Sequence, residues 1–356
     1  MKILIRSIVV LLIVSLSNLL ISCGDDNTTA PGVGGFVTGY NAQESSECMT
    51  LASLAYQNEN DPVQIRDSLI IQLANTNYAT GGKWTLDWGP ALSSDQSNMM
   101  YVVKDASTEP DRYTLAIRGT DWCFPFNWEE DLGAIDFSKY PYGGSGDSIS
   151  YGALQGLTTL LALRDSATNK TLVSYLNDIS ASKNQMYITG HSLGGMLATV
   201  MSAWFLDNGY GSKFNLKTYT YAAPSAGNPQ FKDHYTQIFN GANAESHRVE
   251  NPKDLVHYFQ GDLQYVIDNA IPTSIPLSVD VVLIAIKTYF QSNGMEYVHV
   301  GERFALGTTN PTDCNYAPFT IDDYACWVSY EHTTTTYLAL LGAPITNVST
   351  VTCGWK

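Results

Sequence analysis

The stretch Gln185-Met186-Tyr187-Ile188-Thr189-Gly190-His191-Ser192-Leu193-Gly194 decides the fold of this chain. Residues 186–189 predict a strand, and the apolar run 195–206 predicts a buried helix that ends near Asn208. Between them, Gly-x-Ser-x-Gly is typical of a sharp turn that exposes a serine hydroxyl to a histidine. A purely structural turn is the alternative, since glycine-rich turns are common. The flanking strand and helix favour a nucleophile at Ser192.

Hydrophobic periodicity predicts the elements around this turn. Helices are expected over 45–57 and 63–73, with Asp61-Pro62 as cap and first turn, and over 151–179 as one long helix or two shorter ones. Further strands are expected over 99–104, 113–118, 216–221 and 246–249, the first two as an antiparallel hairpin. Strands separated by helices predict an α/β fold, with a mainly parallel sheet covered by helices on both faces.

Composition indicates a globular protein with a large core. Of 356 residues, 44% are hydrophobic and 15% are charged, and the formal net charge is −15. We find no internal repeat and no linker after Gly39, so a single domain is expected over 40–356. The acidic charge disfavours nucleic acid as a partner. No Cys/His spacing resembles a zinc site, so no metal is expected.

The first residues predict a targeting segment. Lys2 and Arg6 precede an apolar run over 8–21 that is short for a membrane span. Leu20-Ile21-Ser22-Cys23 resembles a bacterial lipobox, which implies cleavage before Cys23 and lipid attachment to it. Residues 1–22 would then be a lipoprotein signal peptide and 23–39 a flexible tether. The alternative is a plain signal peptide. The lipobox interpretation places the protein in a bacterial envelope, anchored to the outer membrane through Cys23 and facing the periplasm or the cell surface.

The other cysteines suggest disulfides in that oxidising compartment. Cys314 and Cys326 lie close together in a loop-like region and are expected to pair. Cys48 with Cys353 would tie the two ends of the chain and leave Cys123 odd. The connectivity itself does not follow from sequence.

A serine nucleophile also needs a base, an acid that orients the base, and donors for the oxyanion. On a doubly wound sheet the chain order is serine, acid, histidine. Asp254 follows the predicted strand 246–249 through the turn Asn251-Pro252-Lys253. This placement puts its carboxylate at the carboxyl edge of the sheet, beside Ser192.

The base must then lie beyond Asp254. His257 is too close along the chain to reach the serine easily, which leaves His299 and His332. His332 precedes a predicted final helix over 333–341 and is expected in the loop that enters it. Chain order therefore favours His332.

At this point the motifs resemble those of the fungal-type triacylglycerol lipases (class 3 lipases) of the α/β-hydrolase superfamily. The resemblance runs in order from about Glu44 to Leu341. Its segments are Ala116-Ile117-Arg118-Gly119-Thr120, Asn127-Trp128-Glu129-Glu130-Asp131-Leu132, residues 189–195, residues 218–228, residues 249–254, and Tyr297-Val298-His299-Val300-Gly301-Glu302.

The resemblance implies an α/β-hydrolase fold and a role for each site residue. Ser192 is the nucleophile, His332 the base and Asp254 its orienter. The backbone N–H groups of Thr120 and Leu193 hold the oxyanion, with help from the Thr120 hydroxyl. The family's histidine in the Tyr297 segment is structural, which leaves His332 as the base.

The chain departs from the family in two regions near the expected site. The short segment after Thr120 carries Trp122, Phe124 and Phe126, which form a hydrophobic lip that contacts lipid or simply pack on the sheet's edge. An insertion over 262–293 contains an apolar run interrupted by two prolines and Asp280, which argues against a membrane span. It is expected to cap the serine, and a buried structural helix is the alternative.

The expected function is a serine carboxylic-ester hydrolase, a lipase that acts on acylglycerols through an acyl-enzyme on Ser192. Alternatives on the same fold are a phospholipase A1, a feruloyl-type esterase or a polyester hydrolase, between which fold and triad do not choose. An alternative of another class is a catalytically silent surface protein that binds lipid or glycan. The complete set Ser192, Asp254 and His332 argues against it. We expect a monomer without a cofactor.

Overall fold

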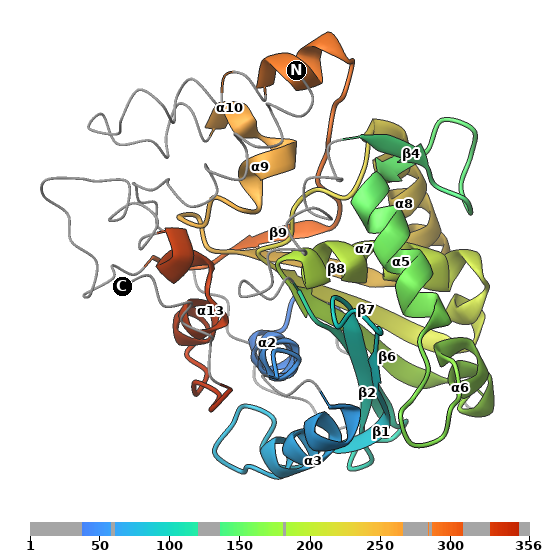
Figure 1. Ribbon diagram of the computed structural model, residues 1–356, viewed down its shortest axis with the longest axis vertical. Coiled ribbons are helices and arrows are strands. Elements are labelled where there is room, and N and C mark those ends of the chain that lie inside the picture. Colours follow the sequence, from blue (N-terminus) through green and yellow to red (C-terminus); the bar gives the residue numbers. More distant parts are fainter. Residues whose placement is uncertain are drawn as a thin grey trace, which may run out of the picture.

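The computed structural model describes residues 38–57, 61–119, 136–180, 183–265, 284, 287–308 and 328–348. Within these ranges, a central sheet has the strand order β1-β2-β3-β6-β7-β8-β9 (Figure 1). Its strands are β1 (Thr85–Leu92), β2 (Met99–Asp105), β3 (Arg112–Ile117), β6 (Asn184–His191), β7 (Phe214–Tyr221), β8 (Glu245–Glu250) and β9 (Glu302–Ala305). The first three pair antiparallel, and β3 to β9 pair parallel.

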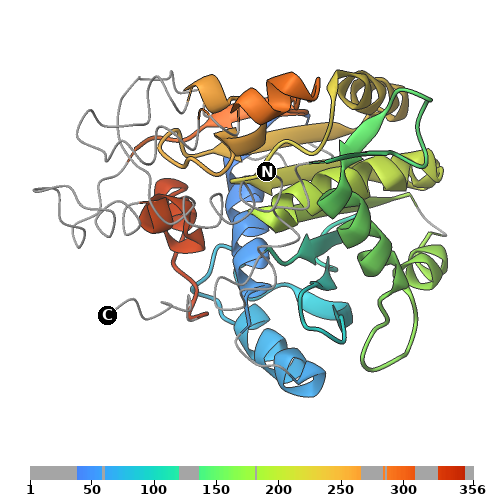
Figure 2. The ribbon, with the colours of Figure 1, turned by 45° about the horizontal axis from the view of Figure 1, so that its top comes forward.

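Helices cover both faces of the sheet, as expected. On one face lie α5 (Tyr151–Ala162), α7 (Leu193–Asp207) and α8 (Pro229–Ala242), and on the other α2 (Ala42–Leu54), α3 (Pro62–Leu73) and α13 (Thr334–Leu340) (Figures 1 and 2). Strand β2 shows the alternation that this layering needs. Met100 and Val102 enter the core under α5 and α7, whereas Met99 and Tyr101 enter the core under α2 and α3.

The remaining elements connect or border these layers. They are the two-stranded sheet of β4 (Phe137–Lys139) and β5 (Ser148–Ser150), α6 (Leu172–Asp178), the 3-10 turn η1 (Tyr210–Ser212), α9 (Tyr258–Gly261) and α10 (Leu263–Tyr265). The region 151–179 thus forms two helices, α5 and α6. No helix in the described ranges is long and apolar enough to cross a membrane.

Most expected elements are confirmed, and a few were missed. Helix α3 starts as predicted, since the Asp61 side chain accepts from the Val63 N–H and Pro62 occupies the first turn. The hairpin of β2 and β3 forms the antiparallel part of the sheet together with β1, which the sequence did not predict. Strand β9 was also missed. It is short and its four residues are exposed, so its sequence lacks the apolar pattern that predicts a strand.

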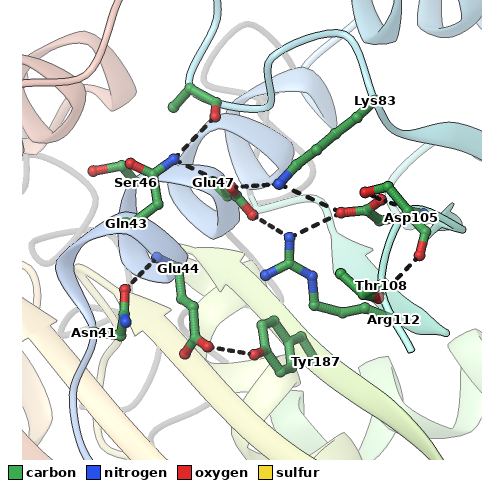
Figure 3. A network of polar contacts seen from close by, with 12 residues as sticks. Asn41, Gln43, Glu44, Ser46, Glu47, Lys83, Asp105, Thr108, Arg112 and Tyr187 are labelled. Atoms are coloured by element: carbon green, nitrogen blue, oxygen red, sulfur yellow. Dashed lines mark hydrogen bonds and ion pairs between the residues drawn. The ribbon is translucent and has the colours of Figure 1, made fainter. Parts of the chain in front are cut away.

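A buried ion-pair cluster fastens α2 to β2 and β3 (Figure 3). The Arg112 guanidinium donates to the carboxylates of Glu47, at 2.6 Å, and Asp105, at 3.1 Å. The ammonium group of Lys83 lies 3.1 Å from Glu47 and 3.4 Å from Asp105. Two carboxylates therefore face two cations, and the charges within the cluster balance.

Helix α2 carries Cys48, for which a disulfide was predicted. Cys48 is buried on this helix and carries a free thiol, so the expected bridge from Cys48 to Cys353 is not formed. The side chain packs among the apolar residues between α2, β7 and α13, where it acts as a small hydrophobic group. Cys23, Cys123, Cys314, Cys326 and Cys353 lie outside the described residues.

Candidate active site

Ser192 occupies the turn between β6 and α7. Its backbone has φ 60° and ψ −131°, a conformation that costs energy in any residue other than glycine. Hydrogen bonds hold it there, since the Ser192 N–H donates to the Tyr221 carbonyl at 2.9 Å and the Gly195 N–H donates to the Ser192 carbonyl at 2.9 Å. The turn places the hydroxyl within hydrogen-bond distance of His332.

The glycines of the motif are required by close backbone approach. A Cβ at Gly190 would lie 2.2 Å from the Gly194 carbonyl oxygen, and a Cβ at Gly194 would lie 2.4 Å from the Ile117 carbonyl oxygen. Any side chain at either position would push the start of α7 away from β6 or β3. The Gly-x-Ser-x-Gly spacing therefore follows from how tightly this helix start packs on the sheet.

The expected nucleophile, base and acid lie in one hydrogen-bonded line. His332 Nε2 is 2.8 Å from Ser192 Oγ, and His332 Nδ1 is 2.8 Å from Asp254 Oδ2. All three side chains are buried. With the Nδ1 proton donated to Asp254, Nε2 is free to accept the proton of the serine hydroxyl.

His332 lies on a helical turn and not in the loop expected from the sequence. Residues 328–332 are helical, and α13 begins two residues later. Thr333 separates the two segments because its backbone is extended and its side chain caps α13 by accepting from the Thr336 N–H. His332 is therefore the last residue of one helical segment, and the cap residue Thr333 joins that segment to α13.

Asp254 is oriented by donors that the sequence did not reveal. The Tyr337 hydroxyl donates to Asp254 Oδ2 at 2.8 Å, and the Val256 N–H donates to Asp254 Oδ1 at 2.9 Å. Burial, followed by the negative charge of Asp254, raises the pKa of Tyr337, so its hydroxyl stays protonated. The helix that follows the base thus also supplies a hydrogen bond to the acid.

A neutral imidazole packs against the base. His191 precedes Ser192, and its ring centroid is 4.8 Å from that of His332. Burial, with a smaller contribution from His332, lowers the pKa of His191 to about 3. The Tyr56 hydroxyl donates to the His191 carbonyl oxygen at 3.1 Å. His191 is therefore an uncharged ring that packs against His332.

In the described structure the other two candidate histidines form no hydrogen bond with Ser192. His257 is buried at the start of α9, and burial, followed by the positive charge of Arg248, lowers its pKa. Burial likewise lowers the pKa of His299, whose ring centroid is 6.5 Å from that of His257. Within the described residues, His332 is the histidine at hydrogen-bond distance from Ser192.

Only part of the predicted oxyanion hole and lid lies within the described residues. Leu193 is the first residue of α7 and follows Ser192 directly. Gly119 approaches the same turn, because a Cβ there would lie 2.4 Å from the His191 carbonyl oxygen. Thr120, Trp122, Phe124 and Phe126 lie outside the described residues, as do 266–283 of the insertion. In the described ranges, no cluster of His, Cys, Asp and Glu could hold a metal ion.

Comparison with known proteins finds similar sequences and structures. Residues 114–262 match the family described as Lipase (class 3). Over 187 residues the chain is 29% identical to "Phospholipase A1-II 1" from Oryza sativa, in both the indica and the japonica subspecies, covering 48% of this chain and 46% of the relative. The chain thus spans about half the length of these curated relatives.

Solved structures show the fold. The structure of M37 lipase matches with a TM-score of 0.68 at 22% identity, covering 85% of this chain and 94% of that one. A propeptide complex of Rhizomucor miehei lipase, a deletion mutant, matches with a TM-score of 0.50 at 16% identity, covering 84% and 79%. The chain therefore has the α/β-hydrolase fold of these lipases, and its residues 114–262 match the class 3 lipase family. The resemblance that the motifs indicated is confirmed.

Proposed function

We propose that this protein is a serine carboxylic-ester hydrolase that acts on acylglycerols. The observation that carries the proposal is the line from Asp254 through His332 to Ser192, with both hydrogen bonds at 2.8 Å and the serine on a strained strand-to-helix turn. The strained backbone at Ser192 lowers the stability of the fold, and a protein that only binds its ligand has no need of it. The strained turn and the complete triad therefore argue against a catalytically silent binding protein.

The geometry supports a two-step reaction. Ser192 Oγ attacks the ester carbonyl carbon while His332 Nε2 takes the hydroxyl proton, and Asp254 stabilises the imidazolium that forms. His332 then gives this proton to the leaving alcohol, which leaves an acyl-enzyme. In the second step His332 accepts a proton from water, the resulting attack releases the carboxylic acid, and the proton returns to Ser192.

The developing negative charge needs donors near Ser192. We assign this role to the backbone N–H groups of Leu193 and Thr120, with the Thr120 hydroxyl assisting. Support comes from Leu193 at the start of α7 and from the close approach of Gly119 to the serine turn. Loss of one such donor typically costs about 3 kcal/mol in the transition state.

A lipid substrate is supported by the class 3 lipase match. Trp122, Phe124 and Phe126 would form the apolar lip that meets it, and the insertion over 262–293 would cover the serine within the one catalytic domain. The rice relatives are named phospholipase A1, so hydrolysis of a phospholipid acyl ester is the second candidate. Feruloyl-type and polyester substrates remain alternatives on the same fold.

Attachment to the outer membrane is a separate part of the proposal. It rests on the lipobox-like Leu20-Ile21-Ser22-Cys23 after an apolar segment. Metabolic labelling with palmitate should mark the wild type and not Cys23→Ala. An unlabelled wild type would contradict lipidation of Cys23. Size-exclusion chromatography of the protein without residues 1–23 should give a monomer.

The experiment for the enzymatic function compares p-nitrophenyl esters from acetate to palmitate. Wild type should hydrolyse them and Ser192→Ala should not, while Ser202→Ala, a buried serine in the interior of α7, should keep most activity. Preference for long chains and for substrate above its solubility limit supports a lipase. No hydrolysis by wild type, or equal hydrolysis by Ser192→Ala, would contradict the proposal. Phosphatidylcholine labelled at the first acyl position separates the phospholipase alternative.

A further inference from the structure

The mechanism above leaves one buried carboxyl group beside the triad without a role. Glu331 precedes the base His332 and is fully buried. Its Oε2 accepts from the Asn251 side-chain N–H at 2.7 Å, and its backbone carbonyl accepts from the same amide at 2.9 Å. Its Oε1 has no hydrogen-bond partner within the described parts of the chain. A buried carboxylate held in this way is incompletely compensated.

Asn251 connects this carboxyl group to the catalytic acid. The backbone N–H of Asn251 donates to the Tyr337 hydroxyl at 3.1 Å, and that hydroxyl donates to Asp254 Oδ2 at 2.8 Å. The Asn251 carbonyl oxygen also accepts from the Asp254 N–H at 2.9 Å. One residue in the turn after β8 therefore contacts the segment of the base, the acid, and the tyrosine that orients the acid.

Burial brings the pKa of Glu331 close to neutrality. Burial raises its pKa to about 7, the negative charge of Asp254 adds to this effect, and the Asn251 hydrogen bond and the positive charge of Lys253 oppose it. Lys253 and Asp254 come from the turn after β8, His332 is next along the chain, and Tyr337 comes from α13 and stays protonated. Glu331 thus changes charge in the pH range where a histidine base works.

We propose that Glu331 is a positioning residue for His332, whose ionised carboxylate acts through Asn251 and Asp254 to favour the imidazolium form of the base. The proposal rests on the proposed ester hydrolysis. Imidazolium forms in both steps of that reaction, and a nearby negative charge in a buried site favours the protonated imidazole. In the described residues Glu331 hydrogen-bonds Asn251 and not Ser192, so its effect reaches the reaction through the base.

The test is the pH dependence of kcat/KM for p-nitrophenyl butyrate in wild type and Glu331→Gln. Glutamine keeps an oxygen for Asn251 and removes the charge. The ratio of wild type to variant should be near one where Glu331 is protonated, and should rise to about three- to tenfold above pH 8, with a midpoint near the Glu331 pKa of about 7. A ratio that is constant over the whole range would show a merely structural role and overturn the proposal.

Lys253→Met tests the same claim with Glu331 intact, in case the glutamine variant folds poorly. Removal of this positive charge should move the midpoint to higher pH, and an unchanged midpoint would contradict the proposal. Glu302→Gln, at an exposed carboxylate on β9, is the matched control and should keep the wild-type profile. If wild type hydrolyses no ester, the proposed function fails. If hydrolysis depends on Ser192 and the ratio stays constant, only the role of Glu331 fails.

Discussion

Two buried pairs of carboxyl groups lie at opposite ends of the parallel strands and behave differently. Glu47 and Asp105 meet Arg112, the first residue of β3, and Lys83 (Figure 3). Asp254 and Glu331 lie beyond the last residue of β8. Asp254 accepts from His332, Tyr337 and the Val256 N–H, and Glu331 accepts from the neutral side chain of Asn251. In the described residues an arginine and a lysine contact the first pair directly, whereas the second pair has the imidazole of His332 and neutral donors.

The pKa values show what the difference does. Burial alone would raise the pKa of Asp105, but hydrogen bonds from Ser107 and the positive charges of Lys83 and Arg112 lower it overall. Burial raises the pKa of Glu331 to about 7, because the opposing effects of Asn251 and Lys253 are smaller. Hydrogen bonds and direct cationic partners therefore lower the pKa of the buried Asp105, whereas the buried Glu331 beside His332 has a raised pKa.

The largest expected effect separates the two clusters by activity. Asp254→Asn should lower kcat/KM for p-nitrophenyl butyrate by about 10⁴-fold, because an amide in place of the carboxylate no longer stabilises the imidazolium of His332. Asp105→Asn should lower the unfolding midpoint and leave the activity of the folded protein unchanged. Comparable activity losses in the two variants, each measured on folded protein, would abolish the distinction between the clusters.

The next effect is on stability. Arg112→Met leaves Glu47 and Asp105 buried with one partner fewer, and should lower the free energy of unfolding by about 3–5 kcal/mol in urea titrations. Lys83→Met is the control, since Lys83 is more than a third exposed and its loss should cost less than about 1 kcal/mol. Equal costs for the two variants would show that burial of the cation does not decide the result.

The pH dependence of stability should reveal Glu331. Its folded pKa of about 7 lies above that of an unfolded glutamate, so the folded state keeps a proton that the unfolded state releases. Wild type should therefore lose up to about 3 kcal/mol relative to Glu331→Gln as the pH rises from about 4.5 to about 7, and nothing further above that range. Thermal unfolding over this pH range measures the difference. Parallel stability curves would show that Glu331 has an ordinary pKa.

The smallest effect concerns the neutral donor to the acid. Tyr337→Phe removes the hydroxyl that donates to Asp254 and should lower kcat/KM by about tenfold, the typical value of one hydrogen bond to a charged group. Tyr235→Phe removes a buried hydroxyl that bonds Ser246, away from the triad, and should leave kcat/KM unchanged. An equal loss in both variants would assign the effect to packing.

The sequence predicted the line of Ser192, Asp254 and His332 because each follows a local signal. The Gly-x-Ser-x-Gly turn, a predicted strand before Asp254 and the required chain order are all visible without contacts. The links from Asn251 to Glu331 and from Tyr337 to Asp254 were not predictable in this way. They join residues about eighty positions apart and depend on how α13 packs against the turn after β8.

The fold shows the same division. Layers, hairpin and most helices follow from hydrophobic periodicity, whereas the exposed strand β9 carries no such signal. The pairing of Arg112 with Glu47 was equally invisible, since it depends on the register in which α2 lies across the sheet. The cluster at the amino ends of the strands was therefore found only in the structure. At the carboxyl ends, Asp254 was predicted and Glu331 was not.

The central claim is that Ser192 is a nucleophile activated by His332. Treatment with diethyl p-nitrophenyl phosphate, followed by mass spectrometry of the peptides, tests it most directly. We predict one diethylphosphoryl group per chain on Ser192 in the wild type, and none after the same time in His332→Ala. An unmodified wild type, an adduct on another residue, or equally fast labelling of His332→Ala would contradict the account.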